Sequence, residues 1–584
     1  MPSPKPLKLE LELPEVPEKA EAPEKAEAPM KVESPEKPKA LQRPEDVLAD
    51  LFAQSIATVP TTATAAALAQ KLASGALIDD LRRSFETATG LSGAILADPI
   101  LTTALKARAT SLSAGLSALW SGPRPSSLTI GTTTYATTWS SASTAVGLQL
   151  PARRSLRGDQ LLKAGGTQAP VVGLWQPGEL RGDGASQVLF GAGLVAGQVM
   201  TDSSRTELGG GADALLGHGL GVGIVNRGLV DLGAGADRVL GTAFFTGVVN
   251  TGRLRLDGDL PLAIKGSQDD EVLGIGAFTG IANFGRIDAS LGSDRLLGAS
   301  AGLAVFNAAA ATIDLGAGRD VVAGGGLGLA MQAMADGGRA STGLPEDLLK
   351  TLRSALTPYA TEVAPEGGLV NQGTLDTGAD GDIVFAVGSM AAVTPETKAI
   401  RGFMAQFGPY DGVALVNGAG ARLRTGAGDD LVLALGADAA TTSRPPAVAN
   451  DGEIDLGSGR DVLLAPDGFT GRGVVKLGDG DDTLLGFGSG RFEFGNGVDA
   501  LGLLAGSYRL RRGERQSIEI TRQGDSAVMR TWNLETINGV RLGSLLARPD
   551  GAFTVGAGKG HVPLPSGSTF DIAARTADLN ALLL

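Results

Sequence analysis

One aspartate recurs in a repeated phrase of the sequence, and a stacked series of such carboxylates can bind cations. The phrase reads VDLGAGADRVLG at residues 230–241, and aligning its copies on the aspartate gives eleven. Two positions before the aspartate the residue is glycine in nine copies, and two positions after it the residue is always Val or Leu. The first copy has Ser186 in place of the aspartate. The other ten copies supply Asp213, Asp237, Asp270, Asp294, Asp320, Asp382, Asp430, Asp461, Asp482 and Asp499.

A column of like charges needs compensation. If successive copies stack at the interstrand spacing of ~4.8 Å, each neighbouring pair of ionised carboxylates repels by roughly 3.5 kcal/mol at an effective dielectric constant of about 20. Calcium, a hard cation that takes about six to eight oxygen ligands, is the natural candidate to offset this. An aspartate in a turn can instead hydrogen-bond to its own backbone without a metal. A second acidic column lies six residues upstream, at Glu207, Asp231, Asp288, Asp314, Asp376, Asp455 and Glu493.

The residues around each aspartate predict a β-solenoid. Apolar and polar residues alternate on both sides of the glycines, which is the period of a strand with one buried face, and the glycines allow a turn with positive φ. The aspartates are 17 to 62 residues apart, which a coil of about 24 residues with insertions explains. Such a coil buries its apolar face only by stacking on its neighbours. We therefore expect a mainly β fold, a parallel β-solenoid or β-roll of about eleven coils; a Greek-key sandwich is the alternative.

A second turn precedes the phrase in five copies. It has the Asn-x-Gly pattern or a close variant of it, which is typical of a tight turn. The five asparagines are Asn226, Asn283, Asn371, Asn417 and Asn450, with Asn417 the looser fit.

Four copies resemble a known calcium-binding repeat. LGGGADALLG, LGAGADRVLG, TGAGDDLVLA and LGDGDDTLLG are similar to the nonapeptide of the RTX (repeats-in-toxin, haemolysin-type calcium-binding) proteins. In that family the repeats form a parallel β-roll that holds calcium between successive turns, through the aspartate and turn carbonyls. The resemblance implies Ca²⁺ as a cofactor, with six ligand candidates at Asp213, Asp237, Asp320, Asp430, Asp461 and Asp482.

The copies also depart from the family's pattern. The family's first glycine is replaced by leucine or threonine, for example Leu232, and one copy occurs per coil where the family has two. Calcium sites that bridge adjacent turns are therefore expected to be incomplete. Basic residues next to the aspartates offer another source of neutralising charge, namely Arg238, Arg295, Arg319 and Arg460.

Composition restricts the function classes. The 86 glycines and 4% aromatic residues suit a repeat protein built of tight turns, and the net charge of −13 argues against nucleic-acid binding. The absence of cysteine excludes disulfides, thiolate catalysis and cysteine-bound zinc. The sequence contains no HExxH, GxSxG or Walker phosphate-loop motif, so we expect no enzymatic activity.

Changes in composition divide the chain into five parts. We expect a disordered Pro/Glu/Lys-rich tail at 1–44, a helical region at 45–122 and a Ser/Thr-rich β segment at 123–174. The repeats fill 175–505, with helical insertions near 340–362 and 394–408. A C-terminal β cap and terminal helix follow at 506–584; in the RTX family such an end acts as an uncleaved secretion signal.

These features predict a non-catalytic, calcium-binding RTX-like solenoid. The N-terminus lacks the apolar region of a signal peptide, and the resemblance implies export by a type I system to the cell surface or beyond. Its role would be structural or adhesive. Its partners would be calcium ions, surface or matrix polysaccharide or protein, and further copies of the chain; we expect neither nucleic acid nor a transmembrane segment. The alternatives are a cytoplasmic scaffold that assembles through the helical region and a polysaccharide lyase or hydrolase.

Overall fold

The computed structural model describes residues 126–571 with ten gaps. The gaps are 131–132, 142–145, 166–171, 194–195, 258–268, 327–366, 389–411, 437–445, 557–560 and 564–568. The predicted tail at 1–44, the helical region at 45–122, the two helical insertions and the terminal helix lie outside the described residues. No described helix is long and apolar enough to cross a membrane.

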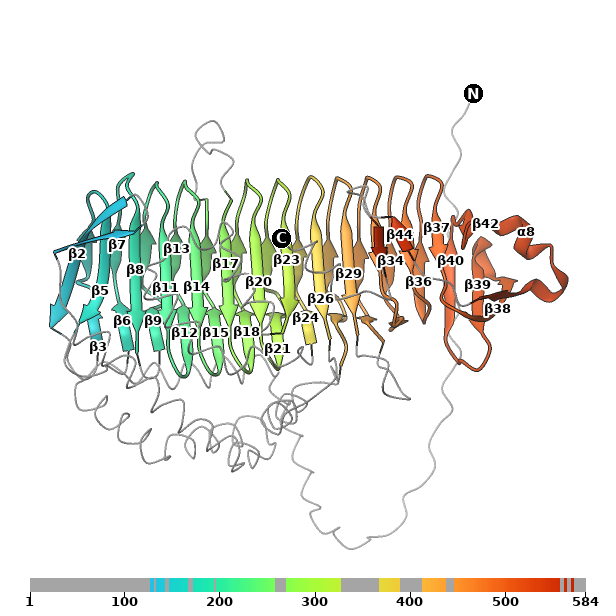
Figure 1. The fold of residues 1–584 in the computed structure, drawn as a ribbon, viewed down its shortest axis with the longest axis horizontal. Helices are drawn as coiled ribbons and strands as arrows, with labels where there is room; N and C mark the ends of the chain where they lie inside the picture. The colour runs from blue at the N-terminus through green and yellow to red at the C-terminus, as the bar shows by residue number, and fades with distance from the viewer. Residues whose placement is uncertain are drawn as a thin grey trace, which may run out of the picture. The chain divides into compact units, whose positions relative to one another are not determined.

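The expected mainly β solenoid is confirmed, because the repeats stack into three parallel sheets (Figure 1). We name the sheets A, B and C. The strands of sheet A, in spatial order, are β1 (Ser127–Ile130), β2 (Thr133–Ser141), β5 (Gln160–Gly165), β8 (Gln187–Ala192), β11 (Ala214–His218), β14 (Arg238–Thr242), β17 (Glu271–Ile275), β20 (Arg295–Ala299), β23 (Val321–Gly325), β26 (Ile383–Val387), β29 (Leu431–Leu435), β32 (Val462–Leu464), β35 (Thr483–Leu485), β37 (Ala500–Gly502), β41 (Thr536–Ile537) and β42 (Val540–Arg541).

Sheet B has eleven strands, which matches the expected number of coils. In spatial order they are β3 (Val146–Gln149), β6 (Val172–Gln176), β9 (Ala196–Met200), β12 (Val222–Asn226), β15 (Thr246–Asn250), β18 (Thr279–Asn283), β21 (Leu303–Asn307), β24 (Gly367–Asn371), β27 (Leu415–Asn417), β30 (Val448–Asn450) and β33 (Phe469–Thr470).

Sheet C consists mostly of three-residue strands and ends in an antiparallel extension. Its strands are β4 (Arg153–Ser155), β7 (Glu179–Arg181), β10 (Arg205–Glu207), β13 (Leu229–Asp231), β16 (Arg253–Arg255), β19 (Arg286–Asp288), β22 (Thr312–Asp314), β25 (Thr374–Asp376), β28 (Arg422–Arg424), β31 (Glu453–Asp455), β34 (Val474–Lys476), β36 (Gly490–Glu493), β40 (Val528–Trp532), β39 (Ile518–Arg522), β38 (Gly506–Arg512) and β43 (Ala552–Val555). Short helical turns lie nearby at η5 (Glu514–Gln516), α8 (Leu542–Leu546) and η6 (Pro549–Gly551), and β44 (His561–Pro563) pairs with β45 (Thr569–Asp571).

Each coil visits the sheets in the order B, C, A. The coil that contains the phrase VDLGAGADRVLG runs through β12, β13 and β14, and the Gly-x-Gly-x-Asp turn joins sheet C to sheet A. Val230 and Val239 on either side of this turn are buried in the main hydrophobic cluster. The alternation of apolar and polar residues in the sequence therefore correctly predicted which side chains face the core.

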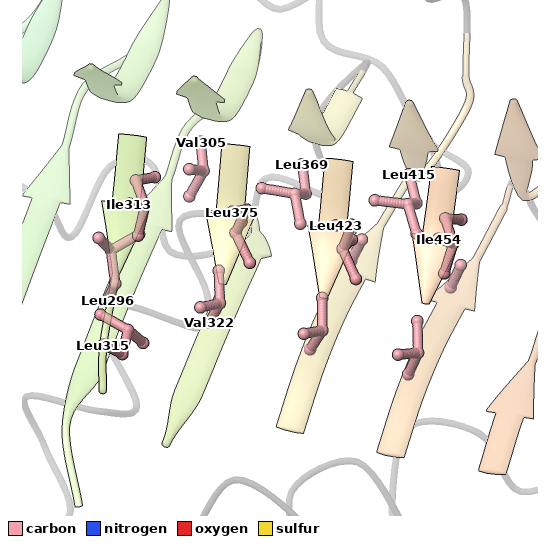
Figure 2. Close-up of a cluster of buried hydrophobic side chains, with 14 of the residues drawn as sticks. Leu296, Val305, Ile313, Leu315, Val322, Leu369, Leu375, Leu415, Leu423 and Ile454 are labelled. Carbon is pink, nitrogen blue, oxygen red and sulfur yellow. The ribbon is translucent and has the colours of Figure 1, made fainter. Parts of the chain in front are cut away.

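Apolar side chains from all three sheets meet inside the coils. Figure 2 shows Leu296 and Val322 of sheet A near Val305 of sheet B and Ile313 of sheet C, and the pattern repeats from coil to coil. A second, smaller cluster contains buried side chains of β26 and β29 such as Phe385 and Leu433. Stacking thus buries a continuous core that no single coil could form alone.

Candidate functional site

The glycines of the Gly-x-Gly-x-Asp turn adopt the positive φ that the sequence predicted. Gly233 and Gly235 have φ of 102° and 157°, and a Cβ on Gly235 would lie 1.5 Å from the Gly211 carbonyl oxygen of the preceding coil. Successive turns are hydrogen-bonded directly, since the Ala234 N–H donates to the Gly209 carbonyl at 3.0 Å. The close approach of backbones therefore requires glycine here.

The ten aspartates form one continuous column along the corner between sheets C and A. Each backbone N–H donates to the carboxylate Oδ1 of the aspartate in the next coil, as Asp213 N–H does to Asp237 Oδ1 at 2.7 Å. Nine such bonds, 2.7–2.9 Å long, link Asp213 to Asp499. All six ligand candidates lie in this column, and so do the other four aspartates of the alignment. We call it the aspartate ladder.

The two ends of the aspartate ladder are closed by other groups. At the first end the Gln187 N–H donates to Asp213 Oδ1 at 2.6 Å, and Ser186 in the aspartate position accepts the Ala212 N–H at 3.0 Å. At the other end the Asp499 N–H donates to Glu535 Oε2 at 2.9 Å. At both ends, the ladder group that faces outward therefore has a hydrogen-bond partner: the Asp213 carboxylate at the first end and the Asp499 N–H at the other.

The second carboxylate oxygen of every aspartate in the ladder is buried without a hydrogen-bond partner. The side chains themselves are 0–1% exposed. Removal from water disfavours the charged form, so burial, helped by neighbouring carboxylates, raises the pKa throughout the ladder. It reaches about 9 for Asp213 and Asp320. It is about 8 for Asp294, Asp382 and Asp461, about 7 for Asp499, and about 6 for Asp430 and Asp482.

Asp237 and Asp270 follow the same trend at the centre of one stretch of the ladder. Burial holds the pKa of both carboxyls well above the usual value, and the nearby Asp257 adds to the effect. The aspartates whose pKa is raised to about 8 or 9 are thus compatible with protonated carboxyls at neutral pH, or with a cation that takes the place of the protons, whereas the pKa of about 6 at Asp430 and Asp482 favours their ionised form.

The donor set offers little beyond these oxygens to a metal. The described residues contain no group of three or more His, Cys, Asp or Glu side chains that could hold a metal ion. In the turns, carbonyls such as those of Gly378 and Ser458 already accept N–H groups from neighbouring coils. Each coil therefore contributes one unpartnered Oδ2, whereas calcium takes about six to eight oxygens.

Three of the four arginines that flank the aspartates lie near other carboxylates, and no described carboxylate pairs with the fourth, Arg319. Arg460 forms an ion pair with Asp429 at 3.4 Å. Arg238 and Arg295 lie in register on either side of Glu271 in sheet A, and both lower the pKa of that carboxyl against the larger effect of its burial. These three arginines thus compensate carboxylates outside the ladder.

The second acidic column is on the outer face of sheet C. Its members lie in register with one another, for example Glu207 beside Asp231 and Asp288 beside Asp314. Arginines on the same face pair with them, as Arg253 does with Asp288 at 3.0 Å and Arg286 with Asp314 at 3.1 Å. This column is therefore a half-exposed lattice of ion pairs, unlike the buried ladder.

A third column, of asparagines, follows the corner between sheets B and C. Each Nδ2 donates to the Oδ1 of the next asparagine at 2.8–2.9 Å and also to a backbone carbonyl, as Asn283 does to Asn307 and to Thr312 O. The members of this asparagine ladder are Asn226, Asn250, Asn283, Asn307, Asn371, Asn417 and Asn450.

Two members of the asparagine ladder, Asn250 and Asn307, were missing from the sequence alignment. Asn250 does have the Asn-x-Gly pattern, but it lies 20 residues before Asp270, whereas Asn226 lies 11 residues before Asp237. Asn307 is followed by Ala308 and Ala309 and lacks the glycine. Asn417, the looser fit, is a full member with bonds to both neighbours.

Comparison with known proteins adds no assignment, since no family model, curated protein or solved structure matches the chain.

Proposed function

We propose that the chain is a non-catalytic structural solenoid that acts at or beyond the cell surface, in adhesion or in a matrix. The observation that supports this most is the continuous register of the coils. Sheets A and C continue from the first described coil to the last, sheet B continues through eleven strands as far as β33, and two buried side-chain ladders connect one coil to the next. In such a protein stability is a sum of contacts between neighbouring coils, which suits a load-bearing spacer.

The location can be tested in the native organism. Intact cells are treated with a protease, and the chain is followed with an antibody in the medium, the surface fraction and the lysate. We expect it in the medium or in the protease-accessible fraction, and we expect export to be lost when residues 571–584 are deleted. A chain that is found only after lysis would support the cytoplasmic scaffold instead.

A second proposal is that calcium stabilises the solenoid in the manner of RTX repeats. It is supported by the unpartnered, buried Oδ2 of each aspartate in the ladder and by the resemblance of the turns to the RTX nonapeptide. Asp213, Asp237, Asp320, Asp430, Asp461 and Asp482 would hold the ion, which would supply the positive charge that the ladder lacks.

Calorimetry of the full chain at pH 8, with Ca²⁺ and then with a chelator, tests the calcium proposal. Binding to the folded state alone raises the melting temperature in proportion to the logarithm of ligand concentration. We expect Ca²⁺ to raise it and the chelator to reverse the rise, whereas Mg²⁺ at equal concentration serves as the control. A melting curve unchanged by Ca²⁺ and chelator would contradict the calcium proposal and leave the structural one standing.

A further inference from the structure

The C-terminal end of the solenoid has a cleft on the outer face of sheet C. Its volume is about 1130 Å³, and residues of β31, β34, β36 and β40 and of the loop after β38 line it. Strands β36, β40, β39 and β38 follow one another in this sheet, at the orange and red end of Figure 1. Pockets for single small molecules are about 300–1,000 Å³, so this cleft has room for a short oligomer.

Basic side chains are concentrated in this cleft although the whole chain is acidic. Arg491 forms an ion pair with Glu493 at 3.0 Å, and Arg530 contacts Glu519 at 3.3 Å. Arg512 and Arg515 also line the cleft, and neither forms an ion pair with a described carboxylate. Two guanidinium groups are therefore available to an anionic ligand, and each has the planar fork that matches a carboxylate.

Trp532 supplies an aromatic surface in the same cleft. The guanidinium carbon of Arg491 lies 5.3 Å from the centre of the Trp532 ring. The Nε1–H of Trp532 donates to the Arg515 carbonyl at 3.1 Å. The hydrogen bond attaches the turn η5, which carries Arg515 and follows Arg512 at the end of β38, to the strand β40. The Trp532 ring and the backbone of Arg515 are thus held together by a direct contact.

The backbone of this cleft is strained at residues that are not glycine. Arg515, Gln516 and Asn533 have φ of 52°, 65° and 56°, a region that costs such residues free energy. Strain of this kind collects at binding and active sites. Arg515 and Asn533 both line the cleft, so the strain includes Arg515, one of the two arginines that form no ion pair with a described carboxylate.

We propose that this cleft binds an acidic oligosaccharide that carries a carboxylate on its sugar rings. Carboxylates such as Glu493 and Glu514 lie among the arginines, so the cleft offers both donors and acceptors. Sugar hydroxyls can use both, and one carboxylate per ring can pair with Arg512 or Arg515. An acidic peptide of the same charge lacks ring hydroxyls, so its side chains cannot donate to the cleft's own carboxylates. The inference rests on the proposed adhesive role and names its ligand class.

Titration calorimetry with the full chain tests the site. The probes are a 1,4-linked uronic-acid hexamer, the corresponding neutral hexamer and a hexaglutamate peptide, each at low and at high ionic strength. We expect the uronic-acid hexamer to bind at least ten times more tightly than the other two. Its affinity should fall at least tenfold in the double variant Arg512→Ala/Arg515→Ala and should weaken as salt is added.

Arg509→Ala is the matched control, because Arg509 is an exposed arginine on β38 outside the cleft. It should bind the uronic-acid hexamer like the unmodified chain. Absence of binding, or equal affinity in the double variant, would overturn the site, and tighter binding of hexaglutamate would overturn the saccharide. Either result would leave the structural proposal intact, because that proposal is tested by cell-surface location.

Discussion

Two corners of the solenoid connect successive coils through different side-chain hydrogen bonds. The asparagine ladder and the aspartate ladder each place one short polar side chain per coil in the interior, and both are bonded from coil to coil. An asparagine amide has a donor and an acceptor, so Asn283 can give a hydrogen bond to Asn307 and accept one from Asn250. An ionised aspartate has acceptors only, and its second oxygen is left without a partner.

This difference indicates that the stability of a buried ladder is independent of pH and cations only when the side chains of the ladder supply both the donors and the acceptors that they need. The Asn283 amide nitrogen has two partners, Asn307 Oδ1 and Thr312 O. The Asp320 carboxyl has one, the Asp294 N–H, and it must bind a proton or a cation to avoid an uncompensated buried charge. We therefore expect pH and cations to act at the corner between sheets C and A.

The largest expected effect is a loss of stability as the pH rises. The pKa of the ladder aspartates in the folded chain is about 6–9, above the value of about 3.9 for an unfolded aspartate. Between these values the folded state holds protons that the unfolded state releases. The stabilisation that comes from the protonated ladder is therefore fully present below about pH 4. It is lost as the pH rises through the folded pKa values. A tenfold difference in proton affinity between the two states is worth ~1.4 kcal/mol per carboxyl.

Denaturant unfolding at pH 5, 6, 7, 8 and 9 measures this dependence. Summed over the coupled aspartates, we expect a decrease of several kcal/mol between pH 5 and pH 8. A chain equally stable at both values would show that the carboxylates are compensated by some other group. Full recovery of stability at pH 8 on addition of Ca²⁺ would identify the cation as that group.

The next largest effect is expected from breaking the asparagine ladder. Asn283→Ala leaves Asn307 Oδ1 without its donor and removes one acceptor of the Asn250 amide, both buried. Unsatisfied buried polar groups cost about 1–3 kcal/mol each, so we expect a loss of about 2–4 kcal/mol. The loss should be the same at pH 5 and pH 8.

Asn283→Asp tests whether charge is what separates the two ladders. The substitution keeps the size of the side chain but replaces the donor Nδ2 with an acceptor oxygen. This oxygen would face the acceptor Asn307 Oδ1. We expect a greater loss than for Asn283→Ala at pH 8 and a smaller one at pH 4, where the carboxyl is protonated and donates again. Equal losses at the two pH values would contradict the comparison.

The fold and the aspartate ladder were predictable because they depend on local backbone geometry. The glycine spacing of the phrase fixes the turn, and the Val or Leu after it fixes which face is buried, as Val230 and Val239 show. A short period with one buried face makes stacking the only way to bury the apolar residues. The register of Asp213 to Asp499 follows directly from that alignment.

The compensation of the ladder was not predictable, since it depends on distances between coils. The sequence places Arg238 beside Asp237, but Arg238 begins β14 and is in register with Glu271 on sheet A, while the Asp237 carboxyl is bonded to Asp213 within the ladder. The cleft at Trp532 was also missed. Its residues come partly from the last repeat strands, β31, β34 and β36, and partly from β38, β39 and β40 of the C-terminal extension, which the repeat does not place beside them.

A smaller effect separates the two functions of a ladder carboxyl. Asp320→Asn keeps the oxygen that accepts the Asp294 N–H but removes the titrating group, so we expect no change at pH 5 and a gain in stability at pH 8. Asp320→Ala removes the acceptor as well and should cost about 1–3 kcal/mol at pH 5. If Asp320→Asn instead destabilises the chain at pH 8, the unpartnered oxygen has a ligand there, and calcium titration of this variant would show reduced affinity.

The smallest effect is expected on sheet C, where the same residue type stacks in the open. Asp314 lies six residues before Asp320, yet Arg286 contacts it at 3.1 Å and its side chain is 41% exposed. Solvent and the arginine share its charge, so Arg286→Ala should cost no more than about 1 kcal/mol, and the cost should vanish at high salt. Thermal unfolding at low and high ionic strength checks this. A loss as large as that of Asn283→Ala would mean that the ion pairs of sheet C, and not the buried ladders, hold successive coils together.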